Sequence, residues 1–162
     1  MSFKIASKKF TPKAALEKAK HYCAYQERCH SEVKNKLYTW GLYSSDVNNI
    51  IVTLIEENFL NEQRFAESFV SGKFRIKHWG KIKIEQQLKG KQISDRCIKE
   101  AIQTIDEQEY EDTCLLLAEK KMGLLEDISN SWDRDVKIYR FLMSKGYDSS
   151  LIKKILLQIK NV

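Results

Sequence analysis

Residues that interrupt helices are scarce in this chain, which has one proline and six glycines among 162 residues. It contains no run of about 18 apolar residues, the length that a membrane-spanning helix requires. Its N-terminal segment has no apolar stretch long enough for a signal peptide. Alternation of β-branched and polar residues, the pattern of a strand, is almost absent. These absences predict an all-α protein that spans no membrane and stays in the cytoplasm.

Common catalytic motifs are missing as well. The chain has no GxxxxGK[ST] phosphate loop, no GxGxxG after a strand, no HExxH and no GxSxG. Its only histidines are His21, His30 and His78, so few candidates exist for a catalytic triad. Adjacent carboxylates such as Glu56 and Glu57 point in different directions on a helix and do not form an acid/base pair. We therefore expect a protein that is not an enzyme and needs no cofactor.

The four cysteines, none of them in a CxxC pair, are Cys23, Cys29, Cys97 and Cys114. In a chain without an export signal, this spacing favours free buried thiols over disulfides. Cys23 and Cys29 lie close in sequence to His21 and His30, which makes a zinc site an alternative. The cluster lacks the short ligand pairs that chelate well, and Cys23 also continues an apolar helical stripe. No metal is expected.

Positive charge is concentrated in one segment. The chain has 28 basic and 22 acidic residues, a formal charge of +6, and residues 73–91 contain seven basic residues and one acid, Glu85. This segment alone therefore accounts for the whole excess and should attract a polyanion or an acidic protein face. Phe74, Ile76, His78 and Trp79 interleave with the cations, and such aromatic rings stack on bases or anchor protein partners. In the alternative interpretation the segment is a solvated helix face with Phe74 and Trp79 in the core.

Apolar residues recur at a constant spacing. Six positions of the first copy reappear 51 residues later and again 105 residues later. The three copies are Val33, Leu37, Leu42, Val47, Ile51 and Leu54; Ile84, Leu88, Ile93, Ile98, Ile102 and Ile105; and Ile138, Leu142, Tyr147, Ile152, Leu156 and Ile159. Three unrelated amphipathic helix pairs are the alternative, but a period near ~50 residues with matching turns is typical of a tandem helical array.

The period predicts three tandem three-helix repeats that form an elongated, curved array with one concave face. The expected divisions are a flexible basic arm at residues 1–12 and repeats at residues 13–58, 59–107 and 108–162. Each repeat buries little alone, so its apolar stripe should pack against the next repeat. The radius of gyration should exceed the ~15 Å of a compact globule of this length.

Capping residues predict where helices begin. Thr11 before Pro12 suits the start of the first helix, and Asn61 and Ser94 precede two helices of the second repeat. In the first repeat, Ser44, Ser45 and Asp46 are expected to cap a helix that begins at Val47. In the third repeat, the acidic residues Glu109, Glu111 and Asp112 indicate a helix start.

Each repeat also contains two helices joined by a tight turn, as in helix-turn-helix DNA readers. In those proteins the second helix carries Arg, Asn or Gln to the bases. Residues 46–57 would be that helix in the first repeat, and they contain no Lys or Arg. Sequence-specific readout is therefore not expected, whereas attraction to a nucleic-acid backbone remains open.

Several short motifs of the first two repeats form a distinctive set: Arg28-Cys29-His30-Ser31-Glu32-Val33 with Lys36-Leu37, Phe59-Leu60-Asn61-Glu62, Arg64-Phe65-Ala66, Phe69-Val70, Gly80, Leu88 and Ile93. In these residues the chain resembles the RecX family of regulators of the RecA recombinase. The resemblance covers residues 14–159 and is strongest in the first two repeats. One departure from the family pattern is Gln92, which stands where a glycine is expected in the turn.

The resemblance implies a curved rod of three three-helix units that lies in the groove of the RecA–DNA filament, and we expect the protein to be a monomer. There it would mainly inhibit strand exchange, ATP turnover and co-protease access, and so regulate DNA repair and recombination. The candidate contacts are Arg28, Lys36, Arg64, Lys73, Arg75, Lys77, Lys81, Lys83 and Lys89. Arg64 has an alternative structural role, in a pair with Glu67 or Glu62. The second hypothesis is a non-specific nucleic-acid-binding helical repeat protein, with single- or double-stranded DNA as its partner.

Overall fold

The computed structural model describes residues 10–161, in which we find nine α-helices and no strand. The all-α prediction is thus confirmed, while the predicted arm at residues 1–12 falls largely on residues 1–9, outside the described part. In chain order the helices are α1 (Pro12–Tyr25), α2 (His30–Thr39), α3 (Ser44–Glu56), α4 (Glu62–Arg75), α5 (Lys81–Gly90), α6 (Asp95–Ile102), α7 (Glu107–Gly123), α8 (Ser131–Lys145) and α9 (Ser149–Lys160).

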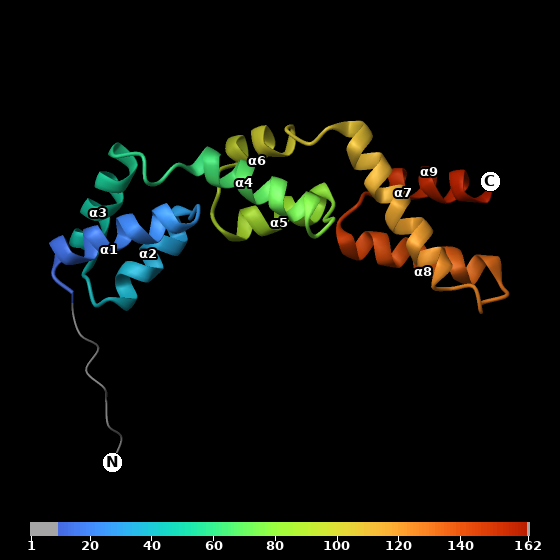
Figure 1. Ribbon diagram of the computed structural model, residues 1–162, viewed down its shortest axis with the longest axis horizontal. Coiled ribbons are helices and arrows are strands. Elements are labelled where there is room, and N and C mark those ends of the chain that lie inside the picture. The colour runs from blue at the N-terminus through green and yellow to red at the C-terminus, as the bar shows by residue number, and fades with distance from the viewer. Residues whose placement is uncertain (1–9, 162) are drawn as a thin grey trace, which may run out of the picture.

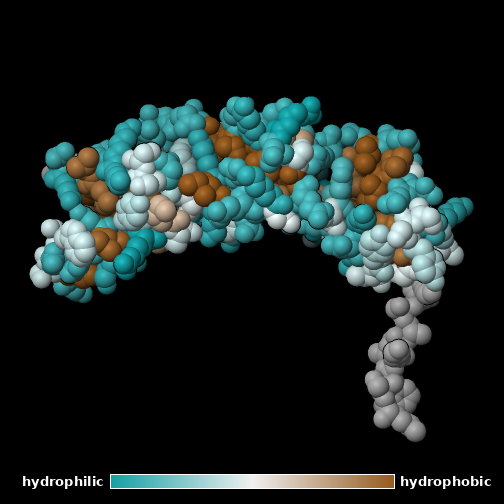
Figure 2. Space-filling view, turned by 180° about the vertical axis from the view of Figure 1, so that it is seen from behind, coloured by the Kyte–Doolittle hydropathy of each residue, from teal (hydrophilic) through white to brown (hydrophobic). Residues whose placement is uncertain are grey.

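The helices form three groups of three, which we name module one (α1–α3), module two (α4–α6) and module three (α7–α9). Within the modules α2 packs on α3, α4 packs on α6, and α7 packs on both α8 and α9. The modules follow one another along the long axis, with α1 and α9 near opposite ends (Figure 1). Figure 2 shows the resulting arch with its hollow side below. The prediction of an elongated, curved array is confirmed.

The aligned apolar positions occupy equivalent places in the three modules. The first four columns are buried throughout: Val33, Ile84 and Ile138; Leu37, Leu88 and Leu142; Leu42, Ile93 and Tyr147; Val47, Ile98 and Ile152. The fifth column, Ile51, Ile102 and Leu156, is half-buried at the edge of the core. The spacing in the sequence therefore reflects a repeated packing unit and not a chance similarity of amphipathic helices.

Several helices begin where the capping residues predicted. Thr11 Oγ1 accepts a hydrogen bond from the Ala14 amide at 3.3 Å, and Asn61 Oδ1 accepts one from the Arg64 amide at 2.8 Å. Ser94 caps α6 through the amide of Cys97. These contacts satisfy amides that have no partner inside the helix.

Two predicted starts were wrong by a few residues. Helix α3 begins at Ser44, so Ser44, Ser45 and Asp46 form its first turn instead of preceding it. Asp46 there lies near the positive end of the helix dipole, which explains why an acidic residue resembled a cap. Helix α7 begins at Glu107 with Asp106 as its cap, so the acidic residues that suggested a start lie inside the helix.

The same turn ends the middle helix of each module. Gly41, Gln92 and Gly146 occupy equivalent positions and have φ angles of 83°, 64° and 98°. The next amide donates to a leucine carbonyl five positions earlier in every case: Leu42 to Leu37 at 3.4 Å, Ile93 to Leu88 at 3.1 Å and Tyr147 to Leu142 at 3.2 Å. Gln92 thus adopts the left-handed conformation of the glycines, at a cost of about 1 kcal/mol.

Modules two and three share a hydrophobic core, whereas module one has its own. At the joint between modules two and three, the Gly80 amide donates to the Lys145 carbonyl at 2.7 Å. The Ile82 amide donates to the Gly146 carbonyl at 3.1 Å. A Cβ on Gly80 would lie 2.2 Å from the Gly146 carbonyl carbon, so the crossing requires glycine. The expectation that apolar stripes join neighbouring repeats is thus confirmed for modules two and three, whereas most of module one packs in a separate core.

Two tyrosines complete this joint. The rings of Tyr110 and Tyr147 lie 5.0 Å apart between centroids, inside the shared core. The Tyr110 hydroxyl accepts from the Lys81 amide at 3.0 Å, and the Tyr147 hydroxyl donates to the His78 carbonyl at 3.1 Å. Burial raises the pKa of both phenols well above the ordinary value, so both stay neutral and available for these bonds.

Replacing Gln92 by glycine should stabilise the protein. The change removes the left-handed strain, and the greater backbone freedom of glycine in the unfolded chain offsets only part of the gain. We expect the free energy of unfolding to rise by about 0.5–1 kcal/mol in urea denaturation. The control Gln92→Ala retains a Cβ in the strained conformation and should bring no gain. A glycine variant no more stable than the alanine variant would contradict this account.

Replacing Gly80 by alanine should destabilise the joint of modules two and three. The new methyl group meets backbone atoms that cannot rotate away, and we expect a loss of about 3 kcal/mol in the free energy of unfolding. Gly90→Ala is the matched control, since a Cβ there meets nothing within 4 Å. Equal stability of the two variants in urea denaturation would show that the backbone crossing is not tight in solution.

Candidate interaction groove

Helix α4 presents two different faces. Ala66, Val70 and Phe74 are buried in the core of modules two and three. Ser68, Gly72 and Ile76, which recur at the four-residue spacing of one helix face, line an open groove on another side. Ile76 is 73% exposed, so the end of this second face is apolar and uncovered.

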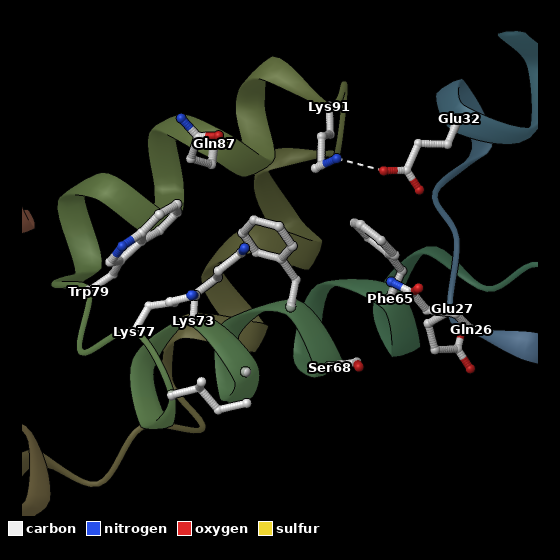
Figure 3. Close-up of a pocket in the computed structure, with 13 residues that line it drawn as sticks. Gln26, Glu27, Glu32, Phe65, Ser68, Lys73, Lys77, Trp79, Gln87 and Lys91 are labelled. Atoms are coloured by element: carbon white, nitrogen blue, oxygen red, sulfur yellow. Dashed lines mark hydrogen bonds and ion pairs between the residues drawn. The ribbon is translucent and has the colours of Figure 1, made fainter.

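The groove runs between α4 and α5, with one end bounded by the turn between α1 and α2, and has a volume of about 490 Å³. In Figure 3, Trp79, Lys73 and Lys77 lie toward one end, whereas Lys91 and Glu32 lie at the other. The complete lining is Gln26, Glu27, Glu32, Phe65, Ser68, Phe69, Gly72, Lys73, Ile76, Lys77, Trp79, Gln87 and Lys91. Residues of two modules therefore form this one surface.

Cations surround Trp79. Lys73 Nζ lies 4.9 Å and Lys83 Nζ 4.7 Å from the centroid of the Trp79 ring, within the range of cation–π attraction. Lys73 Nζ also lies 5.3 Å from the Phe69 ring, and Lys83 Nζ donates to the Ser144 carbonyl at 3.2 Å. Within residues 10–161, no carboxylate forms an ion pair with Lys73, Lys77 or Lys83. This end of the groove therefore carries positive charge that the described residues leave uncompensated.

The other end of the groove is a polar joint between modules one and two. Lys91 Nζ pairs with Glu32 Oε1 at 2.6 Å, and the Ser31 hydroxyl donates to the Lys91 carbonyl at 2.9 Å. Arg64 Nε donates to Glu27 Oε1 at 2.5 Å, while its terminal nitrogens donate to the side chain and carbonyl of Asn58, each at 3.1 Å. Charge-assisted bonds thus hold module one against module two.

The structure divides the basic run that the sequence presented as one patch. Lys73 faces Trp79, but Arg75, two positions further along the helix, approaches Glu109 of module three at 3.8 Å. Lys81 pairs with Glu107 at 2.5 Å and Lys89 pairs with Glu85 at 2.7 Å. Because helical neighbours at this spacing point apart, proximity in sequence did not imply a common surface.

The other three candidate contacts are Arg28 and Lys36 of module one and Arg64 at the joint of modules one and two. Arg28 lies over the Tyr22 ring at 4.2 Å, and Lys36 Nζ is 5.9 Å from the same ring. Arg64 has a structural partner, as one alternative proposed, but the partner is Glu27 and neither Glu67 nor Glu62. Contacts of these residues with another molecule stay predictions.

The aromatic residues of the run have different roles. Phe74 is 3% exposed and its ring lies 5.8 Å from that of Tyr110, so it belongs to the core. Trp79 is half-buried and lines the groove. Sequence reasoning did not identify Glu27 or Phe69 as groove residues, because only the packing of the α1–α2 turn against α4 and α5 brings them together.

All four cysteines are buried free thiols, as predicted. Burial raises the pKa of Cys23 to about 11 and that of Cys114 to about 12, so these thiols stay protonated near neutral pH. Across residues 10–161, no group of three or more His, Cys, Asp or Glu side chains is arranged to hold a metal ion. Nor does any helix in this range have the length and apolarity needed to cross a membrane.

Three tandem three-helix modules with a central groove define a helical-repeat protein. Two family models match the chain: "RecX, second three-helix domain" at residues 61–102 and "RecX, third three-helix domain" at residues 108–156. These ranges correspond closely to modules two and three. The chain belongs to the RecX family.

Curated relatives agree with this assignment, and a solved structure has the same fold. A protein of Clostridium perfringens named "Regulatory protein RecX" is 31% identical over 83% of this chain, which spans 63% of that relative's length. One of Prosthecochloris aestuarii with the same name is 28% identical and is covered over 91% of its length. The crystal structure of RecX from Lactobacillus salivarius superposes with a TM-score of 0.84 at 24% identity, covering 93% of this chain and 97% of that one. This structural similarity establishes the fold and nothing further.

Neutralising Arg64 should weaken the joint between modules one and two. Arg64→Gln leaves the partly buried Glu27 carboxylate without its cation, and we expect a loss of about 1–2 kcal/mol in the free energy of unfolding. Arg96→Gln is the control, because its pair with Glu100 at 3.7 Å is exposed and should contribute less than about 0.5 kcal/mol. Hydrogen exchange would locate the effect, with faster exchange expected first in module one. Indistinguishable losses would argue against a structural role for Arg64.

Proposed function

We propose that this protein regulates the RecA recombinase, mainly as an inhibitor, by binding along the groove of the RecA–DNA filament as a cytoplasmic monomer. The observation that carries the proposal is the arch of three modules with uncompensated cations around Trp79 near its middle. Membership of a family whose relatives are named regulatory proteins supports it. An arch of this kind has a long concave surface that suits a helical filament groove.

Lys73, Lys77 and Lys83 are the contact residues that this proposal favours most, because no carboxylate among the described residues pairs with them. Arg75, Lys81 and Lys89 each have an intramolecular carboxylate partner, which would compete with a partner molecule. Arg28, Lys36 and Arg64 would contribute contacts toward module one. Inhibition would follow if the bound arch bridged neighbouring subunits and hindered strand exchange and ATP turnover.

Non-specific binding to nucleic acid is the second candidate function, favoured by the lysines beside an accessible indole ring. Glu27 and Glu32 line the far end of the groove, and these two carboxylates argue against a nucleic-acid strand that follows its whole length. Titration of single- and double-stranded DNA at two salt concentrations, with and without preformed filament, separates the candidates. Tight, salt-sensitive binding to naked DNA with no preference for filament would favour the second.

Reversing the charges around Trp79 should weaken inhibition of RecA. We expect the triple variant Lys73→Glu, Lys77→Glu and Lys83→Glu to require at least about tenfold more protein for equal inhibition, since complementary charge is replaced by repulsion. The measurement is ATP hydrolysis by RecA on single-stranded DNA.

The control changes the net charge equally at exposed helical positions outside the groove, with Lys34→Glu, Lys99→Glu and Lys153→Glu. Circular dichroism would establish that both triple variants are folded. Equal inhibition by the groove variant, the control and the wild type would remove the cations around Trp79 from the proposed function.

A further inference from the structure

Contacts inside the molecule do not explain why residue 72 is a glycine. It lies in the interior of α4, where glycine costs about 1 kcal/mol relative to alanine. Its φ angle is not positive, and a Cβ at this position would meet nothing within 4 Å. Neither backbone conformation nor internal packing therefore requires glycine here. Gly72 lines the groove, where the missing side chain leaves the α4 backbone open to close approach by another molecule.

Around Gly72, the groove has chemically distinct ends. Phe65, Phe69 and Trp79 supply apolar surface, and Lys73 with Lys77 supply positive charge at the Trp79 end. Such a combination of aromatic rings with unpaired ammonium groups is complementary to a carboxylate that lies beside an apolar side chain.

The end of the groove near module one is lined by the Glu27 carboxylate. Glu27 Oε1 accepts from Arg64, whereas Glu27 Oε2 is buried and accepts no hydrogen bond from any described residue. The Glu27 side chain as a whole is 29% exposed and lines the groove, so its carboxylate would attract an N–H group of a ligand that lies there. Phosphodiesters offer no such donor and would be repelled by Glu27, whereas every residue of a peptide except proline has a backbone N–H.

We propose that this groove binds an extended peptide segment of the partner protein. An Asp or Glu of the segment lies against Lys73, Lys77 and Lys83 beside Trp79, its backbone passes over Gly72, and one of its N–H groups reaches Glu27. The identity of the partner as RecA rests on the proposed function, whereas the class of ligand rests on the groove. The segment would thereby contact modules one and two together.

The test uses the full chain and immobilised overlapping peptides that cover the RecA sequence, with duplicate peptides in which Asn and Gln replace Asp and Glu. Wild type should bind a subset of acidic peptides and lose binding to their amide duplicates. Gly72→Leu, which places a side chain over the groove, and Lys73→Gln should each weaken peptide binding by about tenfold or more.

Gly123→Leu is the matched control, since Gly123 ends α7 in module three and a Cβ there also meets nothing within 4 Å. It should bind peptides as wild type does. Gly72→Ala supplies the stability readout: it should unfold at a higher urea concentration than wild type and yet bind peptides more weakly, which loss of folding cannot explain.

Each result decides the inference. Absence of any peptide that binds wild type, or unchanged peptide binding by Gly72→Leu, would overturn it. Binding of oligothymidylate that weakens in the same variants, without peptide binding, would assign the groove to nucleic acid and overturn it too. Inhibition of RecA ATP hydrolysis by wild type is measured in parallel: if it persists while no peptide binds, only this inference fails, and if it is absent, the proposed function fails.

Discussion

The close passage of Gly80 over Gly146 is the constraint on which the centre of the molecule depends. Two backbones approach to hydrogen-bond distance because neither position has a side chain, and α5 begins immediately after the crossing. The crossing also brings Lys83 of module two to the carbonyl of Ser144 in module three, with its ammonium group over Trp79. The joint of modules two and three therefore sets the geometry of the cationic end of the groove.

The two joints of the arch differ in chemistry. Between modules two and three, a continuous apolar core that includes the tilted ring pair of Tyr110 and Tyr147 excludes water. Between modules one and two, ion pairs of Arg64 and Lys91 cross the joint, and Cys29 of module one packs into the core of its neighbours. Ion pairs near solvent are weaker and more dependent on salt than apolar burial. The groove spans this polar joint, so its shape depends on how module one is held.

Much of the fold could be predicted from the sequence, because apolar periodicity and turn chemistry are local. The columns headed by Val33, Leu37 and Leu42 proved to be equivalent in packing, and Asn61 and Ser94 capped the helices they precede. The first turn of α3 was misplaced because Ser and Asp are favoured both before a helix and inside its first turn. Gln92 shows the limit of a residue-type argument, since the turn retains its left-handed conformation without glycine.

By itself, the sequence determined the helical class, the threefold repeat and the central excess of positive charge, since each depends on residue type and spacing along the chain. Only the tertiary structure decided which charges act together. Because Lys73 and Arg75 point to different sides of α4, Lys73 lies over the Trp79 ring and Arg75 lies near Glu109. Glu27 lines the same groove although it belongs to a different module. The physical reason is that a binding surface is formed by side chains that converge in space, and their directions depend on how separate helices pack.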